Sequence, residues 1–372
     1  MKKVDFINKD NLKIARENVG MTTFFVSKKL TSSKNDLVLS WESGESLPTW
    51  RQTIKLSKIY SVSELVFFSN NLIKRNKAIP DYRISQGVKD GERVKKLVNF
   101  VIRRQEWLEH KLKDDGKKNK LQGSGKDLRQ PNQLALFIKE KLGIDLEEIK
   151  KISGYDARRK ALKYLIERAE NHDIFIGKTV SYHNIEVGEM RGLFVSNDYC
   201  PFIVLNRRDS LSAQIFSLVH ELAHLFRKTE AISNSLEFRK LNNELSNEEV
   251  FCNRVAVELL LPKDDFSETY YNKNDIDGLS EIYKVSTLAI FYRLKDLNKI
   301  RIKDSDDIEK EIKKESEENL KRKKKKKGGN HTNNMKDSNG GLFNRVVSKY
   351  YFENKIGYTE ASSLLNFSVE NL

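Results

Sequence analysis

Hydrophobic residues over the first 70 positions recur at the spacing of short helices. Leu12, Ala15 and Val19 share one helical face within residues 11–19, and Gly20 is suited to end that helix. A polar break that follows residue 30 separates the second of these helices from the third. The same spacing predicts four further short helices, over about 22–30, 34–43, 49–59 and 62–68.

Five short helices with a tight turn between the second and third predict a helix-turn-helix domain over residues 1–70. In such a domain the third helix lies in the major groove of DNA, where its side chains reach base edges and phosphates. A small helical domain that binds protein is the alternative interpretation. The candidate DNA-contacting residues are Lys34, Asn35, Asp36 and Ser40.

Beyond residue 70 the pattern changes twice. Residues 80–175 are charged and helix-prone, with a Lys-, Gly- and Ser-rich stretch at 114–130 that predicts a mobile loop. From 176 to 265, short apolar runs such as Gly192–Val195 and Phe202–Leu205 suit the strands of a small sheet, and strong helices follow them. We therefore expect an α+β protein that is mostly helical.

The last part of the chain divides into three segments. Residues 266–303 again have helix-turn-helix character, which we interpret as a helical lid or substrate-docking module, with DNA binding as the alternative. Residues 304–341 are acidic, then basic, then rich in Gly and Asn, a composition that predicts a disordered linker. Residues 342–372 predict a final helical segment. The basic run Lys321–Lys327 is interpreted as a solvated tether, or alternatively as a source of salt-sensitive nucleic-acid affinity.

Charge and cysteine content narrow the class of protein. The chain carries 68 Lys+Arg against 53 Asp+Glu, a net charge of +15. The run at 321–327 contributes seven cations, so 15 − 7 leaves +8 elsewhere, which permits a polyanionic partner. Two cysteines cannot build a disulfide framework in a chain of this length, and no apolar stretch suits a membrane span or a signal core. We expect a cytoplasmic protein that does not associate with membranes.

The candidate chemistry is concentrated in the sequence His-Glu-Leu-Ala-His at 220–224, inside an apolar helical pattern. His220 and His224 are four residues apart, so both imidazoles project from one helix face and can share a tetrahedral Zn²⁺. Glu221, about 100 degrees round the helix from His220, reaches the open position beside the metal and can take a proton from water there. Two surface histidines on a structural helix are the alternative.

A catalytic zinc needs a third protein ligand. Glu244, Glu248 and Glu249 are all available on spacing. Glu249 also has capping-box spacing from Ser246, which would make it a residue of the helix start and nothing more. Spacing alone leaves the choice among the three glutamates open.

A resemblance to the ImmA/IrrE metallopeptidase family bears on that choice. Glu249 with Asn253, then Ala256 and the Leu-Leu-Leu-Pro of 259–262, is similar to the family's Glu-x-x-Ala-Asn and Ala-x-Leu-Leu-Met-Pro patterns. The resemblance extends over about 175–262 and implies that Glu249 is the third zinc ligand. It also implies a zincin-like fold, in which an edge strand of the sheet pairs with the substrate.

The N-terminal segment resembles the Xre/Cro-type repressor family. Trp41-Glu42-Ser43-Gly44 and Pro48 stand where such domains carry an aromatic-Glu-x-Gly turn and a proline. In the second helix, Thr23-Phe24-Phe25-Val26 replaces the family's usual Gln and Leu-Ala pair. A repressor-like head on an ImmA/IrrE-type peptidase is an arrangement that this family itself displays.

Together these features predict a zinc metalloendopeptidase with a DNA-binding head. One Zn²⁺ would be held by His220, His224 and Glu249, with Glu221 as the general base. The resemblance implies that the substrate is a transcriptional repressor, whose cleavage relieves repression in stress response or mobile-element control. The alternative is a DNA-binding regulator or antitoxin-like protein with a structural or silent zinc site.

Overall fold

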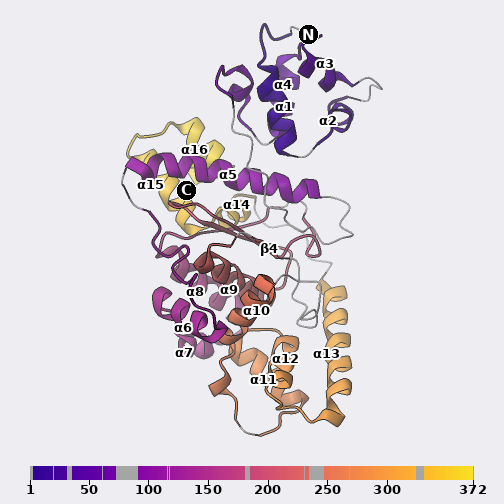
Figure 1. The fold of residues 1–372 in the computed structure, drawn as a ribbon, viewed down its shortest axis with the longest axis vertical. Coiled ribbons are helices and arrows are strands. Elements are labelled where there is room, and N and C mark those ends of the chain that lie inside the picture. Colours follow the sequence, from indigo (N-terminus) through magenta and orange to yellow (C-terminus); the bar gives the residue numbers. More distant parts are fainter. Residues whose placement is uncertain are drawn as a thin grey trace. The chain divides into compact units, whose positions relative to one another are not determined.

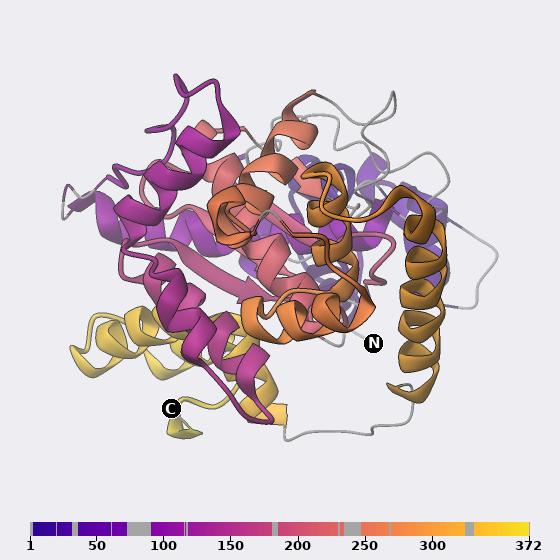
Figure 2. The same cartoon turned by 90° about the horizontal axis from the view of Figure 1, so that it is seen from below.

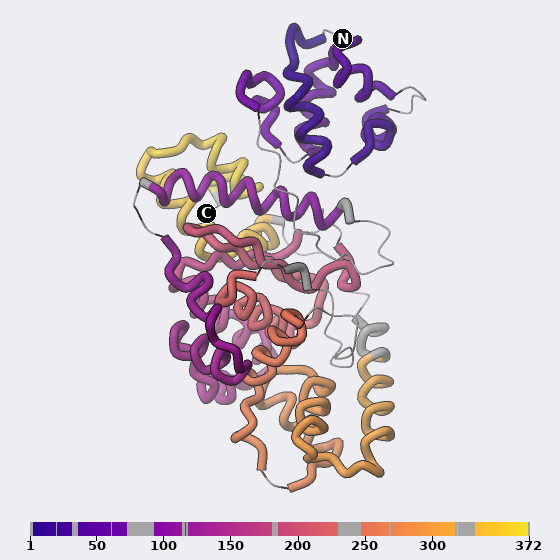
Figure 3. Tube along the Cα trace, in the orientation of Figure 1, coloured from indigo at the N-terminus to yellow at the C-terminus, as the bar shows by residue number. Residues whose placement is uncertain are grey.

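The computed structural model forms two compact units (Figure 1). Unit 1 comprises residues 1–107 and 182–185, and unit 2 comprises residues 108–181 and 186–372. The tube in Figure 3 follows the chain, with colours that run from indigo at the N-terminus to yellow at the C-terminus. The residues that the structure describes are 3–19, 21–31, 36–60, 62–72, 91–114, 116, 118–180, 185–229, 231–233, 247–267, 269–323 and 331–371.

Unit 1 begins with helices at the positions that the hydrophobic pattern predicts. Their apolar faces share one core, which includes Leu12, Val26, Val38, Trp41 and Leu56. Four are α-helices, whereas the fifth is a short 3-10 helix. The elements are α1 (Lys9–Asn18), α2 (Thr23–Leu30), α3 (Leu37–Ser43), α4 (Trp50–Tyr60) and η1 (Glu64–Phe68).

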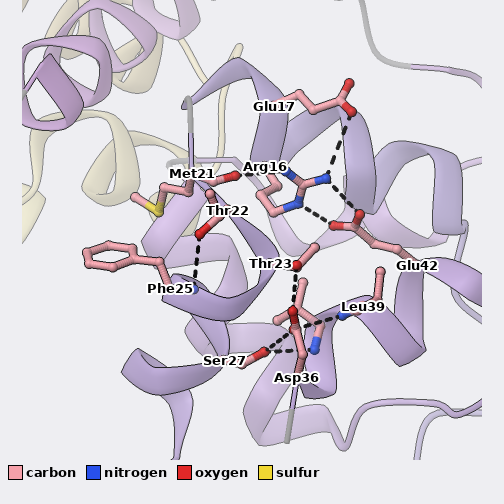
Figure 4. Close-up of polar contacts among 11 residues, drawn as sticks. Arg16, Glu17, Met21, Thr22, Thr23, Phe25, Ser27, Asp36, Leu39 and Glu42 are labelled. Atoms are coloured by element: carbon pink, nitrogen blue, oxygen red, sulfur yellow. Dashed lines mark hydrogen bonds and ion pairs between the residues drawn. The ribbon is translucent and has the colours of Figure 1, made fainter.

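Side-chain hydrogen bonds, most of them partly buried, hold the first three helices together (Figure 4). Arg16 on α1 binds Glu42 on α3 through two parallel hydrogen bonds of 2.6 and 2.8 Å, the bidentate geometry that favours Arg–carboxylate pairs. The carboxylate of Asp36 caps α3 by accepting the Leu39 backbone N–H, and it also accepts the Thr23 hydroxyl of α2. These contacts fix α3 against both α1 and α2.

Between residues 91 and 175 the chain is helical, as predicted. The Lys- and Gly-rich stretch, predicted as a mobile loop, instead forms a series of turns bonded to the end of α9 (Leu211–Arg227). Gly123 and Gly125 donate their backbone N–H groups to the carbonyls of Leu225 and Phe226, at 2.9 and 2.8 Å. The helices are α5 (Gly91–Asp114), α6 (Pro131–Leu142), α7 (Leu146–Lys151) and α8 (Ala157–Glu170).

Unit 2 is built around a small sheet of order β1-β3-β2-β4. β1 runs parallel to β3, whereas β2 runs antiparallel to both β3 and β4. The strands β2 and β3 occupy the predicted runs and are buried throughout, so α9 and α10 (Asn247–Leu260) pack into one continuous core with them. The strands are β1 (Phe175–Lys178), β2 (Gly192–Val195), β3 (Phe202–Leu205) and β4 (Ala231–Ser233).

The module predicted at 266–303 contains two helices, α11 (Lys273–Tyr283) and α12 (Thr287–Asp296), preceded by the 3-10 helix η3 (Lys263–Asp265). Arg293 ties α12 to α10, because its guanidinium binds both carboxylate oxygens of Glu258 at 2.9 and 2.8 Å and donates to the Leu261 carbonyl. This module is therefore attached to the helix that carries Glu249.

The segment 304–341 differs from the predicted disordered linker. Residues 302–323 form helix α13 (Figure 2), and residues 331–339 form α14. Ile308 and Ile312, four residues apart, give α13 a buried face, and the buried carboxylate of Glu309 accepts the Tyr292 hydroxyl of α12. Two buried isoleucines and one buried hydrogen bond therefore stabilise a helix that composition alone predicts to be disordered.

The C-terminal segment is helical, as predicted for residues 342–372. α14 lies against β1, where Asp337 pairs with Lys178 at 2.8 Å and Asn334 binds Arg207. The last elements are α15 (Gly341–Phe352), α16 (Tyr358–Leu365) and the 3-10 helix η4 (Val369–Asn371).

In the part of the chain that the structure describes, no helix is long and apolar enough to cross a membrane.

Candidate metal centre

Helix α9 carries both histidines of the His-Glu-Leu-Ala-His sequence. Ser210 caps the helix by accepting the Ala213 backbone N–H at 3.2 Å, and the preceding Asp209 pairs with Arg191. The helix ends at Lys228, whose positive φ of 59° forms a left-handed C-cap. Because its apolar face packs into the core of unit 2, α9 holds its histidines in fixed, buried positions.

His220, His224 and Glu249 converge at one point between α9 and α10. The two Nε2 atoms lie 3.0 Å apart, and the carboxylate oxygens of Glu249 lie 3.2 Å from His220 Nε2 and 3.3 Å from His224 Nε2. Ligands 2.0–2.1 Å from a tetrahedral zinc stand roughly 3.3 Å from one another. The three donor atoms therefore have both the chemistry and the spacing of a zinc site.

The charge state of Glu249 suits a metal ligand. Burial alone would raise its pKa, but the hydrogen bonds with His220 and His224 outweigh that effect and lower the pKa well below its usual range. The carboxylate is therefore ionised at neutral pH, as a ligand must be. Both histidine side chains are almost completely buried, at 2% and 1% exposure, so the site is shielded from bulk water on the α9 side.

Glu221 lies on the same helix, fully buried against strand β2. A Cβ atom added to Gly192 would stand only 2.9 Å from Cγ and 3.0 Å from Cδ of Glu221. The glycine therefore provides the space that the glutamate side chain occupies. This close approach gives a physical role to Gly192, which the sequence pattern placed only at the start of a predicted strand.

The structure separates the two described candidates for the third ligand. Glu249 joins the histidines, whereas Glu248 points to Arg227, with which it makes a two-point ion pair that includes a 3.0 Å hydrogen bond from Nη2. Glu244 and Ser246 lie outside the described residues. Of these two glutamates, the one that the resemblance implies as the ligand is the one that lies with the histidines, and its role as a zinc ligand stays a prediction.

A second layer of polar groups surrounds His224. Its Nδ1 atom lies 2.9 Å from the Thr229 hydroxyl, which in turn donates to Glu248 at 3.3 Å. The Cys252 thiol is 3.6 Å from the same Nδ1, and burial raises its pKa well above the usual value, so that it stays neutral. Neither Thr229 nor Arg227 belongs to a recognisable motif, and sequence reasoning did not identify them.

The predicted DNA-contacting residues lie at the start of α3 or just before it. Asp36 uses its carboxylate to cap α3 and to accept the hydroxyls of Thr23 and Ser27, and Ser40 binds the Leu37 carbonyl and Ser46. Lys34 and Asn35 fall outside the described residues. DNA contact by these four residues therefore stays a prediction.

Comparison with known proteins bears on unit 2. Residues 176–295 match the family model described as the IrrE N-terminal-like domain, Peptidase_M78. The match extends from the second residue of β1 to the penultimate residue of α12, and it includes both histidines, Glu221 and Glu249. This part of the chain is thus similar to a family of metallopeptidases. No curated protein matches the chain.

Proposed function

We propose that this chain is a zinc-dependent metalloendopeptidase of the ImmA/IrrE type, with His220, His224 and Glu249 as zinc ligands. One observation carries the proposal: three donor atoms on two helices converge at tetrahedral spacing, and Glu221 follows His220 in the same helical turn. A purely structural zinc site has four protein ligands and no use for such a base, whereas a catalytic site has three and keeps one position open. The described residues supply three.

Peptide hydrolysis at this site would need a metal ion held by the three ligands and a proton carrier, Glu221. A zinc ion bound here supplies Lewis-acid polarisation of the scissile carbonyl and makes water more acidic. Glu221 takes a proton from the attacking water, whose oxygen forms the new bond to the carbonyl carbon. The same carboxyl group then gives that proton to the leaving amine as the C–N bond breaks. The burial of Glu221 keeps bulk water from competing for the proton.

The substrate of this reaction is proposed to be a transcriptional repressor, and the N-terminal helices are proposed to bind DNA. The support is the arrangement of five short helices and the net charge of +15. A DNA-binding head would bring the peptidase to the promoter at which its repressor substrate is bound. Cleavage there would relieve repression in stress response or mobile-element control.

Metal content tests the site directly. The wild-type chain is expected to bind one zinc per chain, and His224→Ala and Glu249→Ala are expected to lose it, because two remaining ligands hold zinc weakly. Glu221→Gln should retain the metal, since Glu221 is no ligand. Inductively coupled plasma mass spectrometry of the four purified proteins provides the measurement. A wild type that stays without zinc after reloading would refute the proposed site.

Activity is tested in cells by profiling new protein N-termini after expression of the wild type or Glu221→Gln. Removal of the base is expected to lower cleavage at least 10²-fold. The wild type should then create a neo-N-terminus in a DNA-binding repressor that the variant does not create. Identical profiles, with zinc bound in both proteins, would favour a DNA-binding regulator with a silent zinc site.

A further inference from the structure

The side of His224 that faces away from the metal cluster has a hydrogen-bonded environment of its own. Nε2 points to Glu249 and His220, whereas Nδ1 lies 2.9 Å from the hydroxyl oxygen of Thr229. Thr229 follows the C-cap of α9 and contacts the helix again through its backbone N–H, which donates to the His224 carbonyl at 3.0 Å. The threonine is therefore held beside the histidine by the helix end itself.

The direction of the hydrogen bonds follows from counting protons. A carboxylate can only accept, so the 3.3 Å contact between Thr229 and Glu248 uses the hydroxyl proton of the threonine. The threonine oxygen has no second proton and must accept from His224. When a metal ion takes the place of the contact between Nε2 and Glu249, the single proton of the imidazole therefore resides on Nδ1, and Nε2 offers its lone pair to the metal.

The carboxylate of Glu248 is held in place by Arg227. The guanidinium binds both carboxylate oxygens, and the ion pair with Glu248 raises the pKa of Arg227. Arg227 also donates to the Leu128 carbonyl at 3.1 Å, which anchors it to the turns that precede α6. Arg227 thus pairs with Glu248, Glu248 accepts the Thr229 hydroxyl, and the Thr229 oxygen lies beside Nδ1 of His224.

We propose that Thr229, oriented by Glu248, is a positioning residue that holds His224 as the Nδ1–H tautomer with Nε2 aimed at the metal. This inference rests on the proposed function, because it assigns a second layer to the same zinc site. Outer-shell partners of this kind orient metal-binding histidines, and their loss lowers metal affinity about 10- to 100-fold.

The other histidine of the site lacks a comparable arrangement. His220 Nδ1 has no hydrogen-bond partner among the described residues. The Cys252 thiol is the alternative acceptor near His224, but at 3.6 Å it is a weaker partner than the hydroxyl at 2.9 Å. Substitution of the two neighbours therefore distinguishes their contributions.

The test compares Thr229→Val, which keeps the shape and removes the hydroxyl, with Thr229→Ser, which restores the hydroxyl. Zinc affinity is measured by competition with a chromophoric chelator. The His224 Nδ1 proton is followed by NMR in zinc-loaded, ¹⁵N-histidine-labelled protein. Thr229→Val is expected to bind zinc 10- to 100-fold more weakly and to exchange that proton faster, whereas Thr229→Ser behaves as the wild type. Cys252→Ala is expected to change neither quantity.

Glu248→Gln keeps the size of the side chain but removes its charge. A zinc affinity between those of the wild type and Thr229→Val supports the role of Glu248 in orienting Thr229. Wild-type affinity in Thr229→Val, with an unchanged Nδ1 proton, overturns the inference while the zinc site stands. A wild type that binds no zinc overturns the proposed function, and the inference with it.

Discussion

At the scale of single residues, the position of Glu221 depends on a side chain that is absent. Gly192 lies in β2 where the glutamate packs, and a methyl group there would meet Cγ at 2.9 Å. Contacts this short require one partner to move. Strand β2 is held by β3 and β4 on its two sides, so the glutamate is the partner that yields. Gly192 therefore determines where the proposed base lies.

Gly192→Ala is accordingly expected to lower peptidase activity on the order of 10²-fold, because a shift of about 1 Å in a catalytic group has an effect of that size. Zinc content should be unchanged, since no ligand moves. Gly188→Ala is the matched control, because an added Cβ there meets nothing within 4 Å. Equal activity of the two variants, measured on the substrate found by N-terminal profiling, would contradict this role.

Some residues of the candidate site could be predicted from the sequence, and others could not. His220, Glu221 and His224 are identifiable because helical periodicity fixes their relative directions. Only the family resemblance favoured Glu249 over Glu248. Adjacent residues of a helix point in different directions, and sequence spacing does not tell which of the two directions faces the histidines of another helix. Thr229 carried no signal, because a hydroxyl after a helix end is common and its partner is 19 residues away.

At the scale of elements, Arg293 couples the α11–α12 module to α10. Its side chain is 7% exposed and binds both oxygens of Glu258. Removal of one partner of such a pair leaves the other partly buried and unpaired. Because α10 also carries Glu249, the position of a metal ligand depends on a contact made more than two helical turns away.

Arg293→Leu is therefore expected to lower the free energy of unfolding of unit 2 by on the order of 2–3 kcal/mol. The double variant with Glu258→Leu should recover part of that loss, because it removes the unpaired carboxylate. Urea unfolding followed by circular dichroism gives the values. Arg159→Leu provides the control, since its pair with Asp156 is exposed and spans 3.5 Å. Equal effects of the two single substitutions would refute the coupling.

Elements were predicted well where local pattern decides them and less well where tertiary contacts do. The helices of unit 1 and the strands β2 and β3 occur where the periodicity predicts them. α13 was predicted to be disordered because its charge dominates its composition. The two isoleucines that bury its inner face are stabilised by α12, a partner that a composition argument does not include.

At the scale of the whole molecule, the division into two units separates the proposed activities. Every residue of the metal cluster, together with Glu221, Gly192 and Thr229, belongs to unit 2. The candidate DNA contacts belong to unit 1. Metal binding and DNA binding are therefore expected to be separable by truncation.

A chain that lacks residues 1–90 should retain one zinc and lose most of its affinity for duplex DNA. To remove sequence-independent attraction, residues 321–327 are replaced by glutamine in both the full and the truncated chains. Fluorescence anisotropy at several salt concentrations measures DNA binding, and plasma mass spectrometry measures zinc. Equal DNA affinity of the two chains would contradict a DNA-binding role for the N-terminal helices.

Because Cys252 is buried beside His224, the chemical labelling of its thiol reports on local opening between α9 and α10. A neutral, enclosed thiol reacts with alkylating reagents only when α9 and α10 part, so its labelling rate measures how often this pair opens. Cys200 is equally enclosed, but its thiol contacts Asn197 in the loop between β2 and β3 instead of a residue of the metal cluster. The ratio of the two rates, measured by mass spectrometry, distinguishes the opening of the α9–α10 pair from the opening of unit 2 as a whole.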